Sequence, residues 1–185
     1  SGGKMIIKDN KLFFTVGDYS LDRINKLPSD IAPQNPNLPW GKVNYIDLSN
    51  NKFFIYTIGH RNPLGLVALR NGEILESENG PQGGDELNVL VRGANYGWPY
   101  VSYGTVYGSF AKYGDSLPAN KLSMKYVNPV FSFLPSVAPT SIVEIMTFNR
   151  KWSNDLVMGS LKAQSLYRMK YEGGRIVYVE PIDLG

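Results

Sequence analysis

The sequence predicts an all-β protein, and within that class a β-propeller of about three four-stranded antiparallel blades. First, helical periodicity is nearly absent along the 185 residues. Second, the apolar residues gather in short runs, rich in β-branched and aromatic side chains, that Gly, Asn, Asp and Pro separate. Third, these runs form three groups of four, each group about 50 to 60 residues long, and such repetition is typical of propellers. A β-sandwich of about twelve strands is the alternative fold.

The first group of runs predicts four strands joined by tight turns. Asp9-Asn10 separates the first two strands, and residues 49–51 separate the last two, because Asn, Asp and Ser favour tight turns. The four runs are KMIIKD, KLFFTVGD, KVNYIDLS and KFFIYTIGH.

The second and third groups repeat this arrangement. Asn71-Gly72 is the strongest short hairpin signal in the chain, and Gly173-Gly174 predicts a second hairpin. The second group comprises GLVALRNG, EILESENG, ELNVLVRG and PVFSFLP, and the third comprises TSIVEIMTF, NDLVMGSL, QSLYRMKYEGG and RIVYVEPIDL. We therefore expect one partial propeller domain over residues 1–185, with blades at 4–60, 61–134 and 138–184.

Composition excludes several classes of function. The chain has no cysteine and one histidine, His60, so cysteine chemistry and zinc sites built from several histidines are excluded. The net charge of +3 comes from scattered Lys and Arg, which argues against a nucleic-acid partner. No apolar stretch approaches the ~20 residues of a membrane-spanning helix, and no signal-peptide pattern opens the chain. If the protein is an enzyme, we expect a bound cofactor to supply the chemistry.

Residues 76–88, ESENGPQGGDELN, place glycines and a proline among carboxylates and amides between two predicted strands. A solvated turn is the simpler interpretation. The alternative is a loop that directs carbonyl and carboxylate oxygens at a metal ion, since hard cations such as Ca²⁺ bind oxygen ligands.

Seven stretches resemble those of a known family and occur here in one order: TVGD, GKVNYIDL, GHRNPLGL, ENGPQGGDELN, GANYGWPYVSYG, PSVAP and GSLKAQSLYRM. The series resembles the soluble quinoprotein sugar dehydrogenases, the glucose/sorbosone dehydrogenase family, over nearly the whole chain. The resemblance implies a six-bladed propeller that binds pyrroloquinoline quinone (PQQ) and calcium. Three blades would then be half of a ring.

The resemblance also implies the metal ligands. The Gly-Pro of the acidic loop, here Gly80 and Pro81, would offer backbone carbonyls to a calcium ion that sits on the quinone and polarises its carbonyl. Asp85 and Glu86, with the carbonyl of Tyr96, resemble a second, structural calcium site.

Four further residues match cofactor contacts of the family. Arg61 and Asn62 match residues that hydrogen-bond the quinone oxygens, Lys162 matches a lysine that pairs with the cofactor carboxylates, and Ser136 lies where a hydroxyl contacts the cofactor. We do not assign His60 as a catalytic base, because a lone histidine beside a turn is more often a structural hydrogen-bonding residue.

The implied activity is oxidation of an aldose by hydride transfer to the quinone, with a sugar or small polyol as substrate. The family's general-base histidine lies upstream of the region resembled, so we expect this chain to carry the cofactor and calcium side of the site and no catalytic base. Negligible sugar oxidation by the chain alone is the expected result. The alternative function is a non-catalytic binding or scaffold module that has kept the propeller fold.

The resemblance further implies a periplasmic or secreted protein. Three blades form an open arc, and an open arc leaves two blade faces uncovered. We therefore expect either a homodimer that completes the ring or association with the missing blades.

Overall fold

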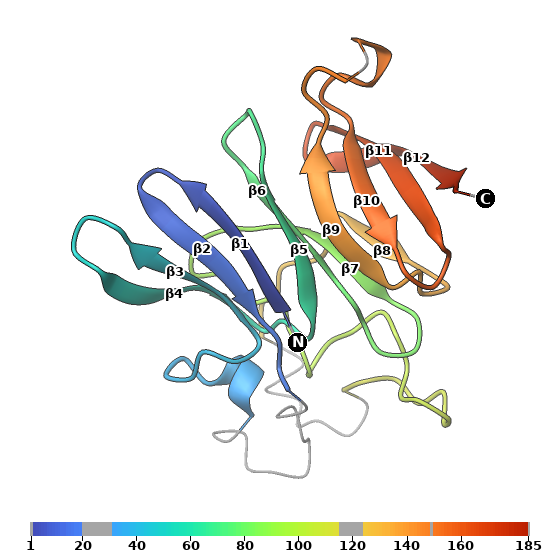
Figure 1. Ribbon diagram of the computed structural model, residues 1–185. Coiled ribbons are helices and arrows are strands. Elements are labelled where there is room, and N and C mark those ends of the chain that lie inside the picture. Colours follow the sequence, from blue (N-terminus) through green and yellow to red (C-terminus); the bar gives the residue numbers. More distant parts are fainter. Residues whose placement is uncertain (1, 20–30, 115–123, 149, 185) are drawn as a thin grey trace.

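The computed structural model describes residues 2–19, 31–114, 124–148 and 150–184, and its strands form three four-stranded antiparallel sheets (Figure 1). In each sheet the strands pair in chain order, β1-β2-β3-β4, β5-β6-β7-β8 and β9-β10-β11-β12. The first sheet contains β1 (Gly2–Lys8), β2 (Lys11–Val16), β3 (Lys42–Asp47) and β4 (Lys52–Ile58). The second contains β5 (Pro63–Ala68), β6 (Ile74–Glu78), β7 (Asp85–Val89) and β8 (Phe131–Phe133). The third contains β9 (Pro139–Glu144), β10 (Leu156–Ser160), β11 (Ser165–Glu172) and β12 (Arg175–Asp183).

These sheets are propeller blades, which confirms the predicted fold class and excludes the sandwich. Each blade is a simple up-and-down meander, and the first strands of adjacent blades lie side by side, β1 against β5 and β5 against β9 (Figure 1). Two short 3₁₀ helices, η2 (Ala32–Gln34) and η3 (Arg150–Trp152), lie in the connections between strands.

The predicted hairpin turns have the required backbone conformations. Asp9 and Asn10 have φ angles of 49° and 55°, in the left-handed region that Asn and Asp tolerate better than other side chains. Gly72, which ends the turn between β5 and β6, has a φ of 93° and donates its N–H to the Leu69 carbonyl. Turn chemistry therefore fixes where these strands end.

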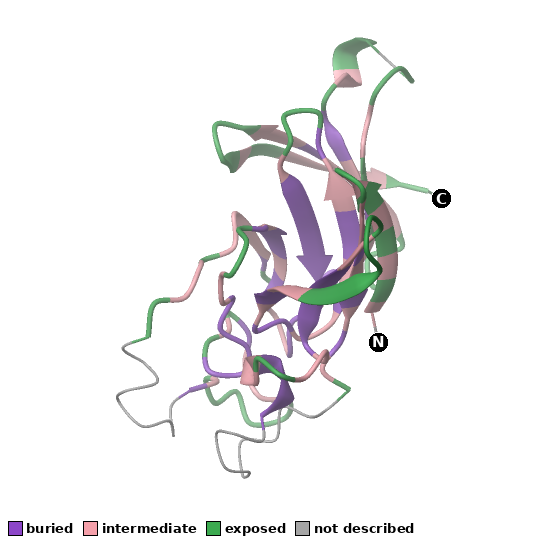
Figure 2. Ribbon diagram, turned by 90° about the vertical axis from the view of Figure 1, so that its left-hand side faces the viewer, coloured by how far each residue is buried: buried purple, intermediate pink, exposed green. Residues whose placement is uncertain are grey.

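The hydrophobic core lies between the blades, and Figure 2 shows buried residues in the middle strands and in the connections below them. The first cluster joins blades one and two through residues such as Phe13, Val43 and Leu66. The second joins blades two and three through residues such as Leu87, Ile142 and Met169. The two clusters cover the middle blade on both sides, and the first and third blades each on one side.

Alternate connections meet at one end of the antiparallel blades. The connections that follow β4, β6, β8 and β10 span residues 59–62, 79–84, 134–138 and 161–164. Because neighbouring antiparallel strands reverse direction, these four connections lie at the same end of the molecule. The candidate functional site lies among these connections.

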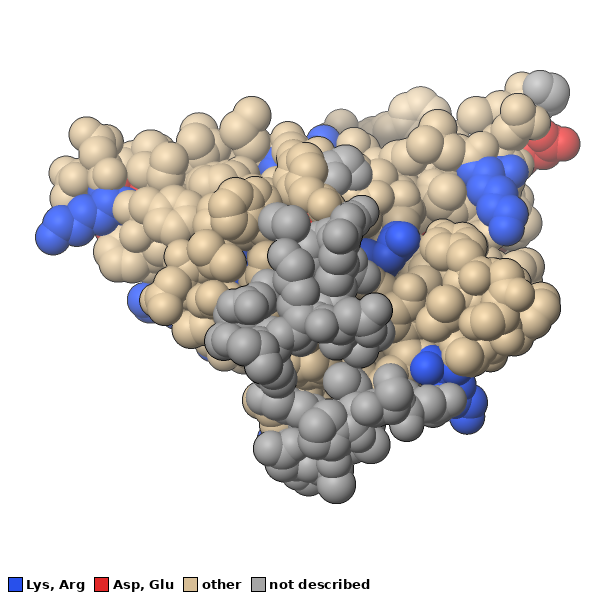
Figure 3. Space-filling model, turned by 90° about the horizontal axis from the view of Figure 1, so that it is seen from below, with Lys and Arg blue, Asp and Glu red and all other residues tan. Residues whose placement is uncertain are grey.

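The face shown in Figure 3 has separate Lys and Arg side chains rather than one continuous basic patch. No helix in the described ranges is long and apolar enough to cross a membrane.

Candidate functional site

The connections at one end of the blades enclose a cavity of about 460 Å³. All four predicted cofactor-binding residues line it, and so do three of the five predicted metal ligands. They are Arg61, Asn62, Ser136 and Lys162, with Gly80, Pro81 and Asp85. Residues more than 100 positions apart in the chain thus contribute to one cavity, and sequence spacing alone does not predict this convergence.

Hydrogen bonds hold both the backbone and the side chain of Arg61 at this cavity. Its backbone N–H donates to Glu78 Oε2 at 2.7 Å. Its guanidinium Nη1 donates to the carbonyl oxygens of Asn79 and Gly80, at 2.9 Å and 2.7 Å. The guanidinium carbon also lies 5.4 Å from the centre of the Trp98 ring, within the range of a cation–π contact. Arg61 therefore fastens the connection after β4 to the loop after β6.

Asp85 connects the same loop to the third blade. Its Oδ1 accepts hydrogen bonds from the Gly80 N–H at 2.9 Å and the Ser136 hydroxyl at 3.1 Å. Its Oδ2 accepts from the backbone N–H groups of Val137 and Ala138, both at 2.8 Å. The predicted ligand Asp85 thus has donors on both carboxylate oxygens. These bonds hold residues 80–85 and 136–138 together at the wall of the cavity.

The cavity wall also has polar groups available to a ligand. Among the described residues, the Pro81 carbonyl accepts one hydrogen bond, from the Ser136 hydroxyl at the long distance of 3.4 Å. The side-chain oxygen of Asn79 is buried and accepts no hydrogen bond from the described residues. Because buried polar atoms are nearly always paired, an orphaned oxygen beside the cavity favours a polar or cationic ligand there.

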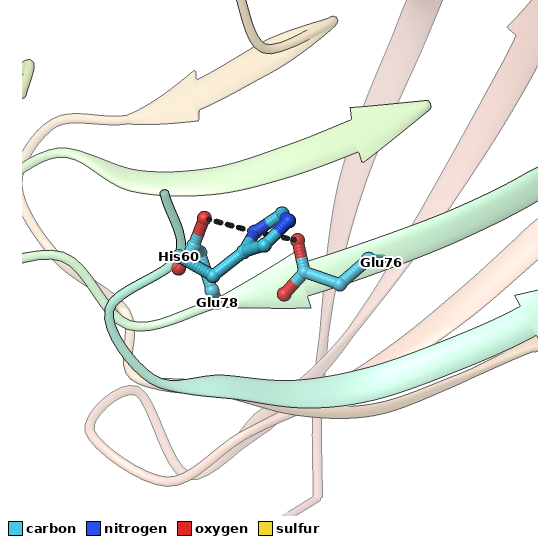
Figure 4. A group of neighbouring side chains, drawn as sticks. All are labelled: His60, Glu76 and Glu78. Atoms are coloured by element: carbon cyan, nitrogen blue, oxygen red, sulfur yellow. Dashed lines mark hydrogen bonds and ion pairs between the residues drawn. The ribbon is translucent and has the colours of Figure 1, made fainter. Parts of the chain in front are cut away.

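His60, Glu76 and Glu78 form a buried cluster (Figure 4). His60 Nδ1 lies 3.2 Å from Glu78 Oε1 and 3.8 Å from Glu76 Oε2, and its Nε2 lies 2.9 Å from the Thr57 hydroxyl. Asn88 Nδ2 donates to both carboxylates at 3.1 Å. The imidazole is fully buried, stacks on Tyr96 at 4.7 Å and does not line the cavity.

Glu86 belongs to the other face of β7, beside this cluster. Side chains of adjacent strand residues point to opposite faces, so Asp85 reaches the large cavity while Glu86 faces Asn88. Burial raises the pKa of Glu76 and Glu86 well above the usual range of a carboxyl group, and the nearby Glu78 carboxylate raises both pKa values further.

A second, small cavity of about 10 Å³ adjoins the first. Glu86 and Tyr96 line it together with Glu78. This volume suits a single ion or water molecule. The structure therefore brings Glu86 and Tyr96 to one small cavity that the side chain of Asp85 does not line, and their role as calcium ligands stays a prediction.

No motif in the sequence singles out Glu78, which supports the cavity through the backbone of Arg61. It is 3% exposed, and it contacts both His60 and the backbone of Arg61. A signal was present, because Glu76 and Glu78 lie two residues apart in a predicted strand and must share one of its faces. Two carboxylates on one face of a buried strand require partners there.

Residues 1–184 match the Glucose / Sorbosone dehydrogenase family. The chain belongs to this family. It is 34% identical over 143 residues to quinoprotein glucose dehydrogenase B of Acinetobacter calcoaceticus, an alignment that covers 65% of this chain and 30% of that protein. It is 29% identical over 137 residues to the aldose sugar dehydrogenase YliI of Escherichia coli strain K12, covering 71% of this chain and 35% of that protein.

Solved structures of the family share the fold. A glucose dehydrogenase crystal structure superposes with a TM-score of 0.78 at 26% identity, covering 98% of this chain and 54% of the other. The PQQ-bound aldose sugar dehydrogenase of Streptomyces coelicolor superposes with a TM-score of 0.71 at 20% identity, covering 98% of this chain and 48% of the other. The chain thus spans about half the length of these solved structures and about a third of the curated relatives.

Proposed function

We propose that this chain forms the cofactor- and calcium-binding side of a PQQ-dependent sugar dehydrogenase. The observation that carries the proposal is the single cavity in which Arg61, Asn62, Ser136 and Lys162 meet the carbonyl loop at Gly80 and Pro81. The four side chains come from three separate connections, yet all of them face the same space.

The donor set fits an anionic, oxygen-rich cofactor. Arg61 and Lys162 supply positive charge for carboxylates, and the planar guanidinium suits a planar partner. Asn62 and Ser136 add neutral polar groups to the wall. When bound, the quinone supplies the acceptor for the hydride that leaves the sugar carbon. The protein's part is to bind and orient that group.

The carbonyls of Gly80 and Pro81 are the proposed ligands of a calcium ion in this cavity. Calcium takes oxygen ligands in flexible geometry, and two consecutive carbonyls on a glycine-rich loop can supply them. We propose a second calcium ion at the small cavity, bound by the Glu86 carboxylate and the Tyr96 carbonyl. Asp85 contributes by holding the carbonyl loop in place through its four hydrogen bonds.

The proposed substrate is a sugar or a small polyol, and the proposed location is the periplasm or the exterior of the cell. We assign no general base to this chain, since His60 is buried and lies outside the cavity. The proposal therefore concerns binding of quinone and calcium.

Titration of the chelator-treated chain with PQQ, followed by absorbance in the presence and absence of calcium, tests the proposal. We expect saturable, calcium-dependent binding that Lys162→Gln weakens about tenfold, the usual effect of losing one charge-assisted contact. Lys52→Gln, on the exposed start of β4, should leave binding unchanged. Absence of any calcium-dependent spectral change would favour the binding or scaffold module instead.

A further inference from the structure

Arg61 and the proposed calcium ion share one partner, the carbonyl oxygen of Gly80. We infer that Arg61 opposes calcium at this oxygen and that the anionic quinone relieves the opposition, so that ion and quinone bind cooperatively. The inference rests on the proposed function. It adds that Arg61 acts on the metal as well as on the quinone, with effects of opposite sign.

The position of Arg61 is set by its surroundings. Its backbone N–H donates to Glu78, which is 3% exposed and lies on β6, the strand paired with β5. Its guanidinium reaches back along the wall and donates to two successive carbonyls, those of Asn79 and Gly80. Because its backbone and its side chain are both hydrogen-bonded, the Arg61 guanidinium is held beside the carbonyl groups of Asn79 and Gly80.

No carboxylate in the described part of the chain forms an ion pair with the Arg61 guanidinium. Glu78 Oε2 receives the backbone N–H of Arg61 rather than its side chain. Asp85, the acidic residue that lines the same cavity, has its oxygens occupied by three backbone N–H groups and the Ser136 hydroxyl. Among the described residues the Arg61 guanidinium is therefore held by two carbonyl groups and the Trp98 ring, and not by an ion pair.

A calcium ion on the Gly80 carbonyl would lie close to this charge. Calcium–oxygen distances are about 2.3–2.6 Å, and the guanidinium nitrogen lies 2.7 Å from the same oxygen. A carbonyl oxygen has two lone pairs and can accept both partners, but a dication and a guanidinium would then lie within about 5 Å of each other. That separation is well below the screening length of physiological salt, so the two cations repel each other.

A bound quinone that carries carboxylates would offset the repulsion between the calcium ion and the guanidinium. Its negative charge attracts the ion and the guanidinium together, and its oxygens offer Arg61 an alternative to the Gly80 carbonyl. By linkage, each ligand then raises the affinity of the protein for the other. Calcium retention would thus depend on the quinone, and Arg61 would be the residue that creates the dependence.

Calorimetric titration of calcium, with and without PQQ, tests this inference on the full chain. The Glu86→Gln background removes the proposed second calcium site from the measurement. In that background and without quinone, Arg61→Gln should bind calcium about tenfold more tightly, a typical size for coupling between sites. The same variant should bind quinone more weakly, and the gain in calcium affinity on adding quinone should shrink.

Lys162→Gln is the matched control. It removes one positive charge from the same cavity, but the Lys162 side chain does not contact the Gly80 carbonyl. It should raise calcium affinity without quinone by less than Arg61→Gln does. An equal effect of the two variants would show that cavity charge, and not the shared carbonyl, sets calcium affinity, which overturns the inference.

Further results of these titrations also test the inference. Calcium binding by the Glu86→Gln chain that Arg61→Gln leaves unchanged or weakens overturns the inference while the proposed function stands. Absence of calcium binding in every variant overturns both. If Arg61→Gln does not fold, Arg61→Met keeps a long stem beside Trp98 and carries the same expectation. As a measurement on the wild-type chain, the NMR signal of the Arg61 guanidinium should move when calcium is added without quinone, and an unmoved signal contradicts the inference.

Discussion

At the scale of single residues, Asp85 shows how an environment can redirect a predicted role. The sequence suggests a metal ligand, but three backbone N–H groups and one hydroxyl occupy its carboxylate oxygens. Hydrogen bonds to a charged group contribute about 1.5–3 kcal/mol each when intact, and buried donors left unpaired are costly. Asp85 therefore stabilises the wall of the cavity, and the free energy of unfolding should depend on it.

Asp85→Asn should lower the free energy of unfolding by about 2–3 kcal/mol, because the new amide N–H₂ faces N–H groups that need an acceptor. Urea unfolding of the two chains measures this difference. Asp47→Asn is the control, since an asparagine can still accept the turn hydrogen bond from the Ser49 N–H, and its effect should stay below about 0.5 kcal/mol. Equal stability of Asp85→Asn and the wild type would contradict the role assigned to Asp85.

The buried glutamates should make stability depend on pH, and on calcium if the proposed second site binds it. Burial, and next the Glu78 carboxylate, raise the folded-state pKa values of Glu76 and Glu86 above the ordinary pKa of a glutamate, about 4.5. For an acid with a raised pKa, the folded state binds more protons than the unfolded state. The stability that these two groups contribute is thus fully present below about pH 4.5 and is lost as pH rises through their folded-state pKa values.

Calcium should therefore stabilise the chain more at pH 8 than at pH 5, because at pH 8 the carboxylates need a counter-cation. Thermal unfolding at both pH values, with calcium and with a chelator, measures the effect. Glu86→Gln should reduce it. A calcium shift of the same size at both pH values would show that Glu86 and its neighbours do not bind the ion.

The sequence predicted the residues of the large cavity better than it predicted their supports. Arg61, Ser136 and Lys162 meet in one cavity, as the family resemblance implies, although their roles there remain predictions. Glu78 was missed because its task is to accept the N–H of Arg61, and no motif records a bond from a side chain to a backbone. Such contacts depend on the register of β5 on β6, which pairs Pro63 with Glu78 and which local sequence does not specify.

At the scale of elements, the loop between β6 and β7 owes its shape to neighbouring glycines. Gly83 and Gly84 have φ angles of 81° and 66°, which side-chain-bearing residues rarely adopt. A Cβ atom on Gly84 would lie 2.2 Å from the backbone nitrogen of Gly104, whereas one on Gly83 would meet nothing closer than 3.5 Å. An alanine at Gly83 would therefore introduce backbone strain without a close contact, whereas an alanine at Gly84 would add a steric clash.

Gly84→Ala should cost more stability than Gly83→Ala and should also disturb the cavity. Gly83→Ala adds only the conformational strain of about 1 kcal/mol, while Gly84→Ala forces the loop away from residues 103–104. Thermal unfolding together with PQQ titration measures both consequences. If Gly83→Ala weakens PQQ binding as much as Gly84→Ala does, backbone strain and not the close approach controls the loop.

The strands and hairpins were predicted because their signals are local. Alternating apolar runs and Asn-Gly or Gly-Gly turns fix strands and their ends without reference to the rest of the chain. Lys42 could not be predicted in this way. It is fully buried at the start of β3, where its ammonium donates to the carbonyls of Ala32, Pro33 and Trp40. The hydrogen-bond acceptors of this lysine come from residues 32–40, and the sequence of that stretch contains no recognisable motif.

At the scale of the whole molecule, the open side of the first blade is strongly apolar. Facing residues in neighbouring strands share one side of a sheet, and the register pairs Met5 with Phe14 and Ile7 with Leu12. The same side continues through Ile46, which pairs with Leu12 and Phe53. Met5 and Ile7 are 61% and 70% exposed. An apolar side of this extent is suited to cover by another blade.

We propose that a second copy of the chain, or further blades of the same protein, covers this side. In a two-fold arrangement that closes a ring, the open side of blade one in each copy packs against the open side of blade three in the other. Light scattering of the chain should then report about twice the 20.6 kDa chain mass. Ile7→Glu should shift the mass toward that of one chain, because burying a carboxylate in an apolar interface is costly.

Val143→Glu distinguishes ring closure from other modes of association. Val143 is 48% exposed on β9, and the adjacent Ile142 faces the core, so Val143 faces the open side of the third blade. Ring closure requires both open sides, and each variant alone should therefore dissociate the dimer. If only Ile7→Glu has an effect, two first blades pack on each other and the ring is not closed. A stable wild-type monomer that binds no apolar dye would contradict the proposal, because the exposed row on β1 would then be tolerated in water.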